Sequence, residues 1–395
     1  MMKFLIAKFD AGERDEEKSD DFSAHMAGLR ENLDVAKSLL DGTDTKAYSK
    51  LMNLLEPFSR EKMTLARMSR NYNITNAWIK AYEIIYELDA AEYFDGPLVH
   101  FDNAAFPGSF ILAIHHYFNT VGACEYKWFA SSLAADTDEV SGHLDDSYDL
   151  HAMYSDQWLM TEKNNGDLTN PANLLDFKAR MPPVNLYTGD LGFDVSDDYN
   201  AQECLHIPAH FGQMLSGLLV MKPGGIMILK QFTFFEDATI SNLAAMTQYF
   251  ETVHIYKPAS SKMDNSEIYV VGKNFRDFDG GKLIGVMLEK LAAATTHVPI
   301  YAREAMGSDF LNSVYAAAYK LTRSQITKIE TNMKIFNEII KLDLEPNETY
   351  AMARDKSRRA RNAVLKKWYR QYQVHAIARQ DRLIMKDAFR QRNIR

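Results

Sequence analysis

Cysteine is scarce in this chain of 395 residues, which contains only two, Cys124 and Cys204. Two cysteines cannot build a disulfide framework or a zinc-ribbon site, and such low usage fits a reducing compartment. Long apolar runs are missing as well. The N-terminal run stops at Lys8 and is too short for a signal peptide, and no stretch approaches the roughly 20 apolar residues of a membrane span. We therefore expect a cytoplasmic protein without a membrane partner.

The common signatures of nucleotide and metal sites are also absent. The sequence has no GxGxxG fingerprint and no phosphate-loop lysine, so neither a dinucleotide nor a nucleoside triphosphate is favoured as ligand. Its histidines lie outside any HExxH pattern and have no cysteine partners. We expect no metal site and interpret five histidines as structural: His100, His115, His116, His206 and His210.

Positive charge is concentrated at one end of the chain. Residues 354–395 hold 14 Lys/Arg against 3 Asp/Glu, a balance of +11. Since the whole chain carries −8, the residues before them carry −19. A basic segment on an acidic body indicates an anionic partner such as RNA. A solvated helix face and an oligomerisation segment are the alternatives that the sequence leaves open.

Aromatic residues are interleaved with the cations of this basic segment. Cations neutralise phosphates and aromatics stack on unpaired bases, so the pattern favours contact with RNA. The competing interpretation is that the aromatics pack the segment onto the rest of the protein, and for Trp368 itself we favour it. The closely spaced residues are Arg358, Arg359, Arg361, Lys366, Lys367, Trp368, Tyr369, Arg370 and Tyr372.

The apolar pattern divides the chain into three parts. Hydrophobic residues make up 46% of the chain, enough for a large core. Apolar side chains recur at helical spacing before residue 97, and beyond residue 275 the pattern is helical only. Between these limits short apolar strands alternate with helical runs. We predict a helical N-terminal extension over 1–70, an α/β domain over 71–275 and a helical, basic C-terminal extension over 276–395.

The middle part is typical of an α/β fold with a mostly parallel sheet. A strand over 97–101, a loop of small residues and a helix over 111–117 form the opening of a nucleotide-binding unit. Later strands and helices alternate until two strands follow each other at the end. We therefore expect one antiparallel strand at the edge of the sheet.

Four charged residues lie where such a fold brings elements together. Asp190 and Lys230 end two predicted strands, Glu267 opens a third, and Lys80 lies on a helical segment before the first strand. Each has an ordinary explanation, because a strand-end lysine can extend to solvent and a strand-end acid can cap a helix. Together, two lysines and two carboxylates around one point are suited to deprotonating a hydroxyl group.

The loop after the first predicted strand is a candidate ligand site. Small residues allow a backbone to approach a ligand, and the N-terminus of the following helix offers free amides. The loop consists of Ala105, Phe106, Pro107, Gly108, Ser109 and Phe110.

At these positions the chain resembles the FtsJ-like RNA 2′-O-methyltransferases, whose signature is a Lys-Asp-Lys-Glu tetrad. The likeness is strong over about 70–275 and is especially marked to the cap-type members of large cytoplasmic DNA viruses, African swine fever virus among them. Ser109 and Leu191 stand where many members have glycine. Five blocks match in the family's order and spacing: 76–83, 102–110, 186–195, 222–232 and 257–269.

The resemblance implies a Rossmann-like methyltransferase fold that binds S-adenosylmethionine. The family's acid for the cofactor ribose has no clear counterpart near Ser131 in this sequence. The implied cofactor contacts are Ala105, Pro107, Gly108, Ser109, Phe110, Asp167 and Asp190.

The resemblance also implies a catalytic role for each member of the tetrad. Lys230 is the base that deprotonates a ribose hydroxyl, which requires a lowered lysine pKa of the kind that burial and a nearby cation produce. Lys80 supplies that cation and orients the hydroxyl. Asp190 holds Lys230 and stabilises the sulfonium side, and Glu267 keeps Lys230 aimed. No metal is required.

We therefore expect an mRNA cap 2′-O-methyltransferase whose partners are capped mRNA and other capping or transcription proteins. Its expected location is the host cytoplasm, or the virion if the protein is viral. Two alternatives stay open: a catalytically weak scaffold or RNA-binding subunit with the same fold, and an enzyme that methylates rRNA or tRNA.

Overall fold

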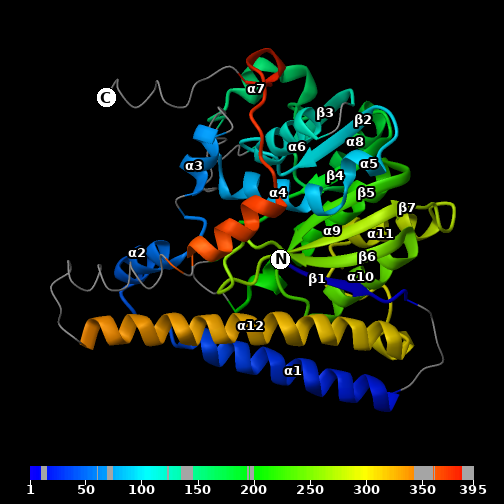
Figure 1. Ribbon diagram of the computed structural model, residues 1–395. Helices are drawn as coiled ribbons and strands as arrows, with labels where there is room; N and C mark the ends of the chain where they lie inside the picture. Colours follow the sequence, from blue (N-terminus) through cyan, green and yellow to red (C-terminus); the bar gives the residue numbers. More distant parts are fainter. Residues whose placement is uncertain are drawn as a thin grey trace.

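The computed structural model describes residues 1–9, 16–59, 61–68, 74–121, 124–134, 146–193, 195, 200–341, 359 and 361–384. Seven strands form one sheet with helices on both faces, and two long helices lie along one end (Figure 1). The strands are β1 (Met2–Ile6), β2 (Leu98–Asn103), β3 (Tyr126–Ser131), β4 (Val184–Gly189), β5 (Met221–Gln231), β6 (Phe250–Lys257) and β7 (Ile268–Phe275). The helices of the N-terminal half are α1 (Glu16–Ser38), α2 (Thr45–Leu55), α3 (Glu61–Met68), α4 (Asn76–Glu87), α5 (Ala90–Tyr93) and α6 (Ser109–Thr120). Those of the C-terminal half are α7 (Leu150–Met153), α8 (Pro171–Arg180), α9 (Gln202–Val220), α10 (Asp237–Tyr249), α11 (Lys282–Ala292), α12 (Ser308–Lys341) and an unlabelled helix over 361–371.

The strand order is β1-β6-β7-β5-β4-β2-β3. β3, β2, β4 and β5 are mutually parallel, as the predicted α/β alternation requires. β7 is antiparallel to both β5 and β6. The antiparallel strand β7 is thus internal and not at the edge, because β6 pairs with its outer side. The edge itself is formed by the N-terminal strand β1, which pairs antiparallel with β6. The Rossmann-like α/β fold is confirmed, and the position expected for its antiparallel strand is corrected.

Residues that alternate along each strand enter two different cores. Tyr187 of β4 and Met227 of β5 face the side covered by α8, α9, α10 and α11. Their neighbours Leu186 and Ile226 face the side covered by α4 and α6. This alternation follows from the two-residue period of a strand, and burial on both faces explains the nearly continuous apolar sequence.

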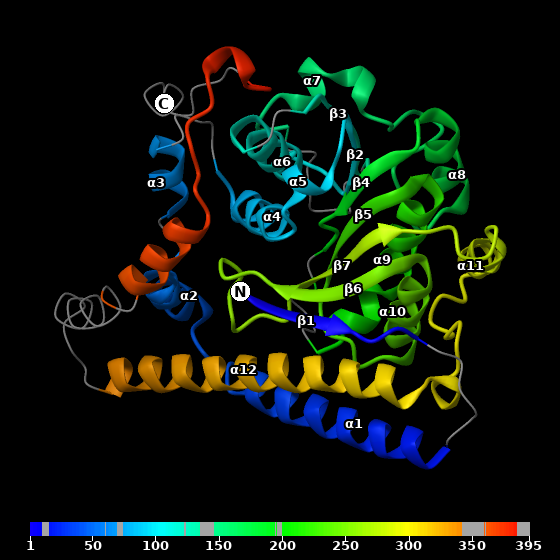
Figure 2. The same ribbon diagram turned by 45° about the vertical axis from the view of Figure 1, so that its right-hand side comes forward.

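Two long helices cross one end of the sheet. α12 and α1 lie side by side, and α12 also contacts β1 and α2 (Figure 2). A separate apolar cluster of α1, α2 and α12 fills the space between them. The longest element of the predicted C-terminal extension is one continuous helix, α12. Within the described residues no helix is both long and apolar enough to cross a membrane.

Neither predicted extension is separate from the sheet. The N-terminal extension over 1–70 is not purely helical, because β1 belongs to the sheet. α11, at the start of the predicted C-terminal extension, packs on α9 and α8. The helix over 361–371 also joins the core on the α4 side of the sheet. The predicted boundary at residue 70 lies outside the described residues.

Two helices place the residues of interest at one edge of the sheet. α4 begins at the cap residue Thr75, whose hydroxyl accepts the N–H of Trp78 at 3.0 Å, and its apolar side packs on α6. α6 follows directly on the predicted ligand loop, with Gly108 at its start. Lys80 on α4 and the loop before α6 therefore share the same face of the sheet.

Candidate active site

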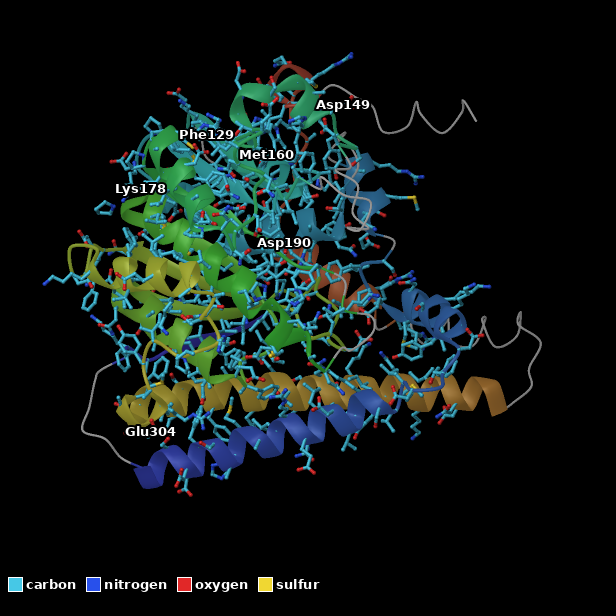
Figure 3. All side chains as sticks on the ribbon, turned by 180° about the vertical axis from the view of Figure 1, so that it is seen from behind. Phe129, Asp149, Met160, Lys178, Asp190 and Glu304 are labelled. Atoms are coloured by element: carbon cyan, nitrogen blue, oxygen red, sulfur yellow. The ribbon has the colours of Figure 1, made fainter. Side chains whose placement is uncertain are left out.

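The register of the sheet brings the ends of three strands together. β4 pairs in parallel with β5, and Gly189 lies opposite Leu229. The next residues, Asp190 and Lys230, are therefore neighbours across the two strands. β7 runs antiparallel to β5, and its Tyr269 lies opposite Lys230. The start of β7 therefore meets the carboxyl ends of β4 and β5, which places Glu267 at the same edge. Asp190 lies in the middle of the molecule, above the two long helices (Figure 3).

The four predicted catalytic residues form two lysine–carboxylate pairs. Lys80 Nζ lies 2.5 Å from Glu267 Oε1, and Lys230 Nζ lies 3.5 Å from Asp190 Oδ1. Lys230 Nζ also donates to the backbone carbonyl of Asp190 at 3.2 Å. All four side chains are between 11% and 19% exposed, so they are shielded from water yet border the surface. The direct partner of Glu267 is Lys80 and not Lys230, which differs from the role expected for it.

The electrostatic environment keeps Glu267 ionised. Burial disfavours its charged form, but the ammonium groups of Lys80 and Lys230 outweigh this effect, and the pKa of Glu267 lies below its usual range. Ser261 Oγ donates to Glu267 Oε1 at 3.0 Å. A lasting negative charge at Glu267 therefore holds the Lys80 side chain in place.

Tyr269 completes the other pair and was not singled out from the sequence. Its hydroxyl donates to Asp190 Oδ1 at 2.9 Å, and its ring is fully buried. Burial and the neighbouring carboxylate of Asp190 raise the pKa of this phenol, so it stays protonated and able to donate. The sequence did offer one signal for Tyr269. It lies two residues after Glu267, and alternate residues of a strand point to the same face of the sheet.

A third lysine lies behind the tetrad. Lys257, at the end of β6, is 3% exposed, and its Nζ donates to Asn265 O at 2.8 Å, Asn265 Oδ1 at 2.7 Å and Glu267 O at 2.7 Å. Burial lowers the pKa of Lys257 to about 7, although the carboxylate of Glu267 opposes this shift. Lys257 therefore ties the loop between β6 and β7 to the residue that pairs with Lys80. Nothing in the local sequence distinguishes this lysine from an exposed one.

Helix α9 braces the chain around Asp190. Gln213 Oε1 accepts the N–H of Leu191 at 3.1 Å, and Gln213 Nε2 donates to the carbonyl of Lys230 at 3.4 Å. The Leu191 side chain is partly buried against the α8–α11 core. At Gly192, an added Cβ would lie 2.9 Å from Lys230 Nζ. Glycine at this position lets the chain pass directly beside Lys230.

The predicted cofactor loop is attached to the end of β3. The N–H of Ala105 donates to Ser131 O at 3.0 Å, and the N–H of Phe106 donates to Ser132 Oγ at 3.0 Å. Ala105 is buried and Pro107 is half-buried. These bonds fix the loop at the carboxyl ends of β2 and β3, the edge where α/β sheets bind ligands.

Gly108 is needed for the shape of this loop. Its φ of +106° lies in the left-handed region that side chains disfavour, and Leu150 fills the space where a Cβ would be. Ser109 Oγ accepts the hydroxyl of Thr75 at 2.9 Å. Because Thr75 caps α4, Ser109 joins the predicted cofactor loop to the helix of Lys80. Phe110 is buried with its ring centroid 6.1 Å from that of Tyr269.

Asp167 lies at the same edge in the loop before α8. Its neighbour Gly166 packs against the backbone of Ser132 at the end of β3. Asp167 Oδ1 accepts both the N–H and the hydroxyl of Thr169 at 2.8 Å. Asp167 is thus close to the cofactor loop, and its carboxylate also stabilises the turn before α8.

Two buried polar residues at this edge were missed in the sequence. Asp102 accepts the hydroxyl of Thr188 at 2.5 Å, and burial raises the pKa of Asp102 well above its usual range, with the charge of Asp190 adding to the effect. Ser131 Oγ is buried without a hydrogen-bond partner in the described residues. An orphaned hydroxyl beside the loop fits a ligand that carries polar groups, such as S-adenosylmethionine.

Two of the histidines interpreted as structural, His100 and His116, make hydrogen bonds inside the protein. His100 lies between Tyr126 OH at 2.8 Å and Thr188 Oγ1 at 2.6 Å, and burial lowers the pKa of His100 to about 3. His116 Nε2 is bonded to the carbonyl of His375 at 2.8 Å. Among the described residues, no three His, Cys, Asp or Glu side chains are grouped closely enough to hold a metal ion.

Two aromatic residues of the basic C-terminal segment, Trp368 and Tyr372, are packed inside the protein. Trp368 is 3% and Tyr372 is 1% exposed, and both belong to the core around α4 and α6. Tyr369 donates its hydroxyl to Glu61 at 2.8 Å. The packing interpretation favoured for Trp368 is confirmed, and the expectation of base stacking is corrected for Tyr372. Lys366, Lys367 and Arg370 of the helix remain exposed. Arg358 lies outside the described residues.

Comparison with known proteins identifies the family. Residues 74–275, which are 202 of the 395 residues, match the FtsJ-like methyltransferases. This chain belongs to the FtsJ-like methyltransferase family. S-adenosylmethionine is the cofactor of that family, in agreement with the loop, the strand ends and the orphaned hydroxyl described above.

Several known proteins are similar to this chain over more than half of its length. The probable methyltransferase EP424R of African swine fever virus is 37% identical over 243 residues, which cover 57% of this chain and 55% of that protein. The cap-specific mRNA (nucleoside-2′-O-)-methyltransferase 2 of Drosophila melanogaster is 28% identical over 320 residues, 77% of this chain and 45% of that protein. The uncharacterized protein L511 of Acanthamoeba polyphaga mimivirus is 29% identical, over 72% of this chain and 37% of that protein. This chain thus spans about half the length of the relatives that it matches.

Proposed function

We propose that this protein is an S-adenosylmethionine-dependent RNA ribose 2′-O-methyltransferase that acts on the 5′ cap region of mRNA. The observation that carries the proposal is the pair of lysine–carboxylate contacts, Lys80–Glu267 and Lys230–Asp190, at one sheet edge beside the cofactor loop. The cap-specific name of one relative supports the choice of substrate. The proposed location is the cytoplasm, with capping or transcription proteins as partners.

Each residue of the tetrad has a distinct task in this proposal. Lys230 accepts the proton of the 2′-hydroxyl. It lies near the carboxyl end of β5, at the sheet edge beside the cofactor loop. Lys80 is held by Glu267 and stabilises the negative charge that develops on the ribose oxygen. Asp190, fixed by Tyr269 and Gln213, orients Lys230.

S-adenosylmethionine supplies the electrophilic methyl group when it is bound. The loop of Ala105 to Phe110, the hydroxyl of Ser131 and the carboxylates of Asp167 and Asp190 are the groups placed to hold it. Asp190 would supply a carboxylate that stabilises the positive charge of the sulfonium. Positioning of the ribose and of the methyl donor then supplies much of the rate enhancement.

Methyl transfer to matched RNAs tests this function. We expect radioactive methyl from S-adenosylmethionine to enter a capped RNA, and to enter the uncapped RNA of the same sequence far more slowly. Equal transfer to both, or transfer only to rRNA or tRNA, would contradict the cap assignment. Binding of S-adenosylmethionine without transfer to any RNA would support a scaffold that has kept the fold.

A further inference from the structure

Phe193 is an exposed aromatic residue beside the catalytic lysine. Its side chain is 50% exposed, and it follows Asp190 by three positions. Gly192, directly before Phe193, passes so close to Lys230 that an added Cβ would lie 2.9 Å from Nζ. Among the described residues the other phenylalanine with comparable exposure is Phe278, at 48%, which follows β7 away from the tetrad.

The ring of Phe193 is held in a defined orientation. It stacks on the ring of His206 with centroids 3.8 Å apart and planes inclined by 11°. The N–H of Phe193 donates to His206 Nε2 at 3.1 Å, and His206 Nδ1 lies 2.7 Å from the carbonyl of Gln202. His206 in turn packs edge-on against Phe232, at 4.7 Å, whose ring lies 5.9 Å from Lys230 Nζ.

The hydrogen bonds also define the state of the histidine. Because Nε2 accepts a backbone N–H and Nδ1 faces a carbonyl, His206 is the neutral tautomer with its proton on Nδ1. Burial and then the nearby charge of Lys230 lower the pKa of His206, in agreement with that state. One face of Phe193 is thus covered by a fixed, uncharged ring, and half of its surface remains available.

An apolar ring exposed to water contributes little to stability, so its fixed orientation at an active-site edge calls for a ligand with a flat face. We propose that Phe193 is a stacking platform for a nucleobase of the RNA substrate. The inference rests on the function proposed above and adds a residue that contacts the base, whereas the tetrad contacts the ribose. A base stacked here lies beside the ribose that Lys230 deprotonates.

The two possible roles of Phe193, stacking on a base and covering His206, require different side chains at this position. If Phe193 only covers His206, any apolar side chain of similar size suffices. If it stacks on a base, it needs an aromatic face, since base–aromatic stacking depends on the π system and tolerates any base. Phe193→Leu separates these two roles, Phe193→Tyr is the conservative variant, and Phe278→Leu is the matched control at a distant exposed phenylalanine.

The experiment measures binding of a short capped oligoribonucleotide by fluorescence anisotropy, with 2-aminopurine placed in turn at each of its first positions. We expect Phe193→Leu to weaken RNA binding by about 5- to 150-fold, the range for one base–aromatic stack. Phe193→Tyr and Phe278→Leu should bind like the wild type, and affinity for S-adenosylmethionine should be unchanged in all three. One 2-aminopurine position should be quenched by the wild type and not by Phe193→Leu.

An abasic site at the quenched position completes a double-mutant cycle. It should weaken binding to the wild type and have little further effect on Phe193→Leu. Wild-type RNA affinity in a folded Phe193→Leu protein would overturn the platform while leaving the methyltransferase function intact. Absence of RNA binding by the wild type itself would overturn the proposed function and the platform together.

Discussion

Trp368 donates its indole N–H to the fully buried carboxylate of Glu83 at 2.9 Å, across 285 positions of the sequence. The same carboxylate accepts the N–H groups of Ala259 at 2.7 Å and Ser260 at 2.9 Å. These residues begin the loop whose next member, Ser261, donates to Glu267. A continuous set of hydrogen bonds therefore links the C-terminal helix to the tetrad.

The same loop is held from a second direction. Gln325 Nε2 of α12 donates to Asp264 O at 3.2 Å, and Asn332 Nδ2 donates to Asp264 Oδ2 at 3.0 Å. Lys257 holds its far end at Asn265. The predicted C-terminal extension therefore supports the loop that presents Glu267 to Lys80.

Replacing Trp368 by phenylalanine should weaken this support. Trp368→Phe keeps most of the buried ring but removes one of three donors to a buried carboxylate, a loss of about 1–3 kcal/mol. We expect a lower free energy of unfolding in denaturant titration and a lower kcat, because Glu267 loses its fixed position. The control is Tyr369→Phe on the same helix as Trp368. It breaks the hydrogen bond to Glu61 of α3 and should leave kcat unchanged. A Trp368→Phe enzyme with wild-type kcat would show that the link does not reach the tetrad.

The stability of the protein should depend on the titration of Lys257. Its pKa is about 7 in the folded state, against 10.5 for an unperturbed lysine, so between these values the unfolded chain binds more protons and stability rises with pH. The shift corresponds to roughly 3–5 kcal/mol over that range. We expect Lys257→Met to flatten the rise in free energy of unfolding between about pH 7 and pH 10.

The slope is the informative quantity in that experiment. Lys257→Met also leaves three carbonyl oxygens without a donor, so its stability is lower at every pH. Lys262→Met, at an exposed position of the same loop, should keep the wild-type slope. An equal slope in Lys257→Met and in the wild type would mean that Lys257 is not the titrating group.

Removing the hydroxyl of Tyr269 should slow methyl transfer. Tyr269→Phe deletes the hydrogen bond to Asp190, and a bond to a charged group contributes about 1.5–3 kcal/mol. If that bond holds Asp190 in the transition state, kcat falls by about 10- to 150-fold with little change in the affinity for S-adenosylmethionine. The matched control is Tyr256→Phe on β6, directly opposite Tyr269, where the buried hydroxyl has no partner in the described residues. Similar losses in both variants would assign the effect to packing.

Lys230 should be essential for rate and dispensable for cofactor binding. Lys230→Ala removes the proposed base and should lower kcat by about 10²–10⁴-fold, while calorimetry shows nearly unchanged affinity for S-adenosylmethionine. Lys222→Ala, exposed at the opposite end of the same strand, is the control and should be fully active. Near wild-type transfer by Lys230→Ala would move the base to another residue.

The exposed cations of the C-terminal helix should contribute to RNA affinity through charge alone. Deleting 354–395 is not a clean test, because Trp368 and Tyr372 are part of the core. The triple change Lys366→Glu, Lys367→Glu and Arg370→Glu leaves those rings in place. We expect weaker RNA binding and a shallower dependence on salt, by about one unit of slope for each phosphate that the helix no longer neutralises.

A matched charge reversal separates local contact from net charge. The exposed α12 residues Lys320, Arg323 and Lys334, changed to glutamate together, alter the net charge equally. We expect this control to leave the salt slope close to that of the wild type. Equal effects of the two triple variants would reduce the role of the helix over 361–371 to a general electrostatic one.

The sequence by itself determined the parts of this protein that depend on short stretches of chain. Strand ends, the cofactor loop and the order of the five family blocks are local features, so the α/β fold and the positions of Lys80, Asp190, Lys230 and Glu267 could be predicted from it. The approach of Asp190 and Lys230 followed from the rule that parallel strands present their carboxyl ends at one edge.

The tertiary structure decided which groups contact each other. The pairing of Glu267 with Lys80, the bond from Tyr269 to Asp190 and the burial of Lys257 depend on strand register and on the β6–β7 loop. The contact of Trp368 with Glu83 and the pairing of β1 with β6 join segments far apart in the chain. Periodicity identifies a buried face but not its partner, because many distant segments of similar polarity could cover the same apolar surface.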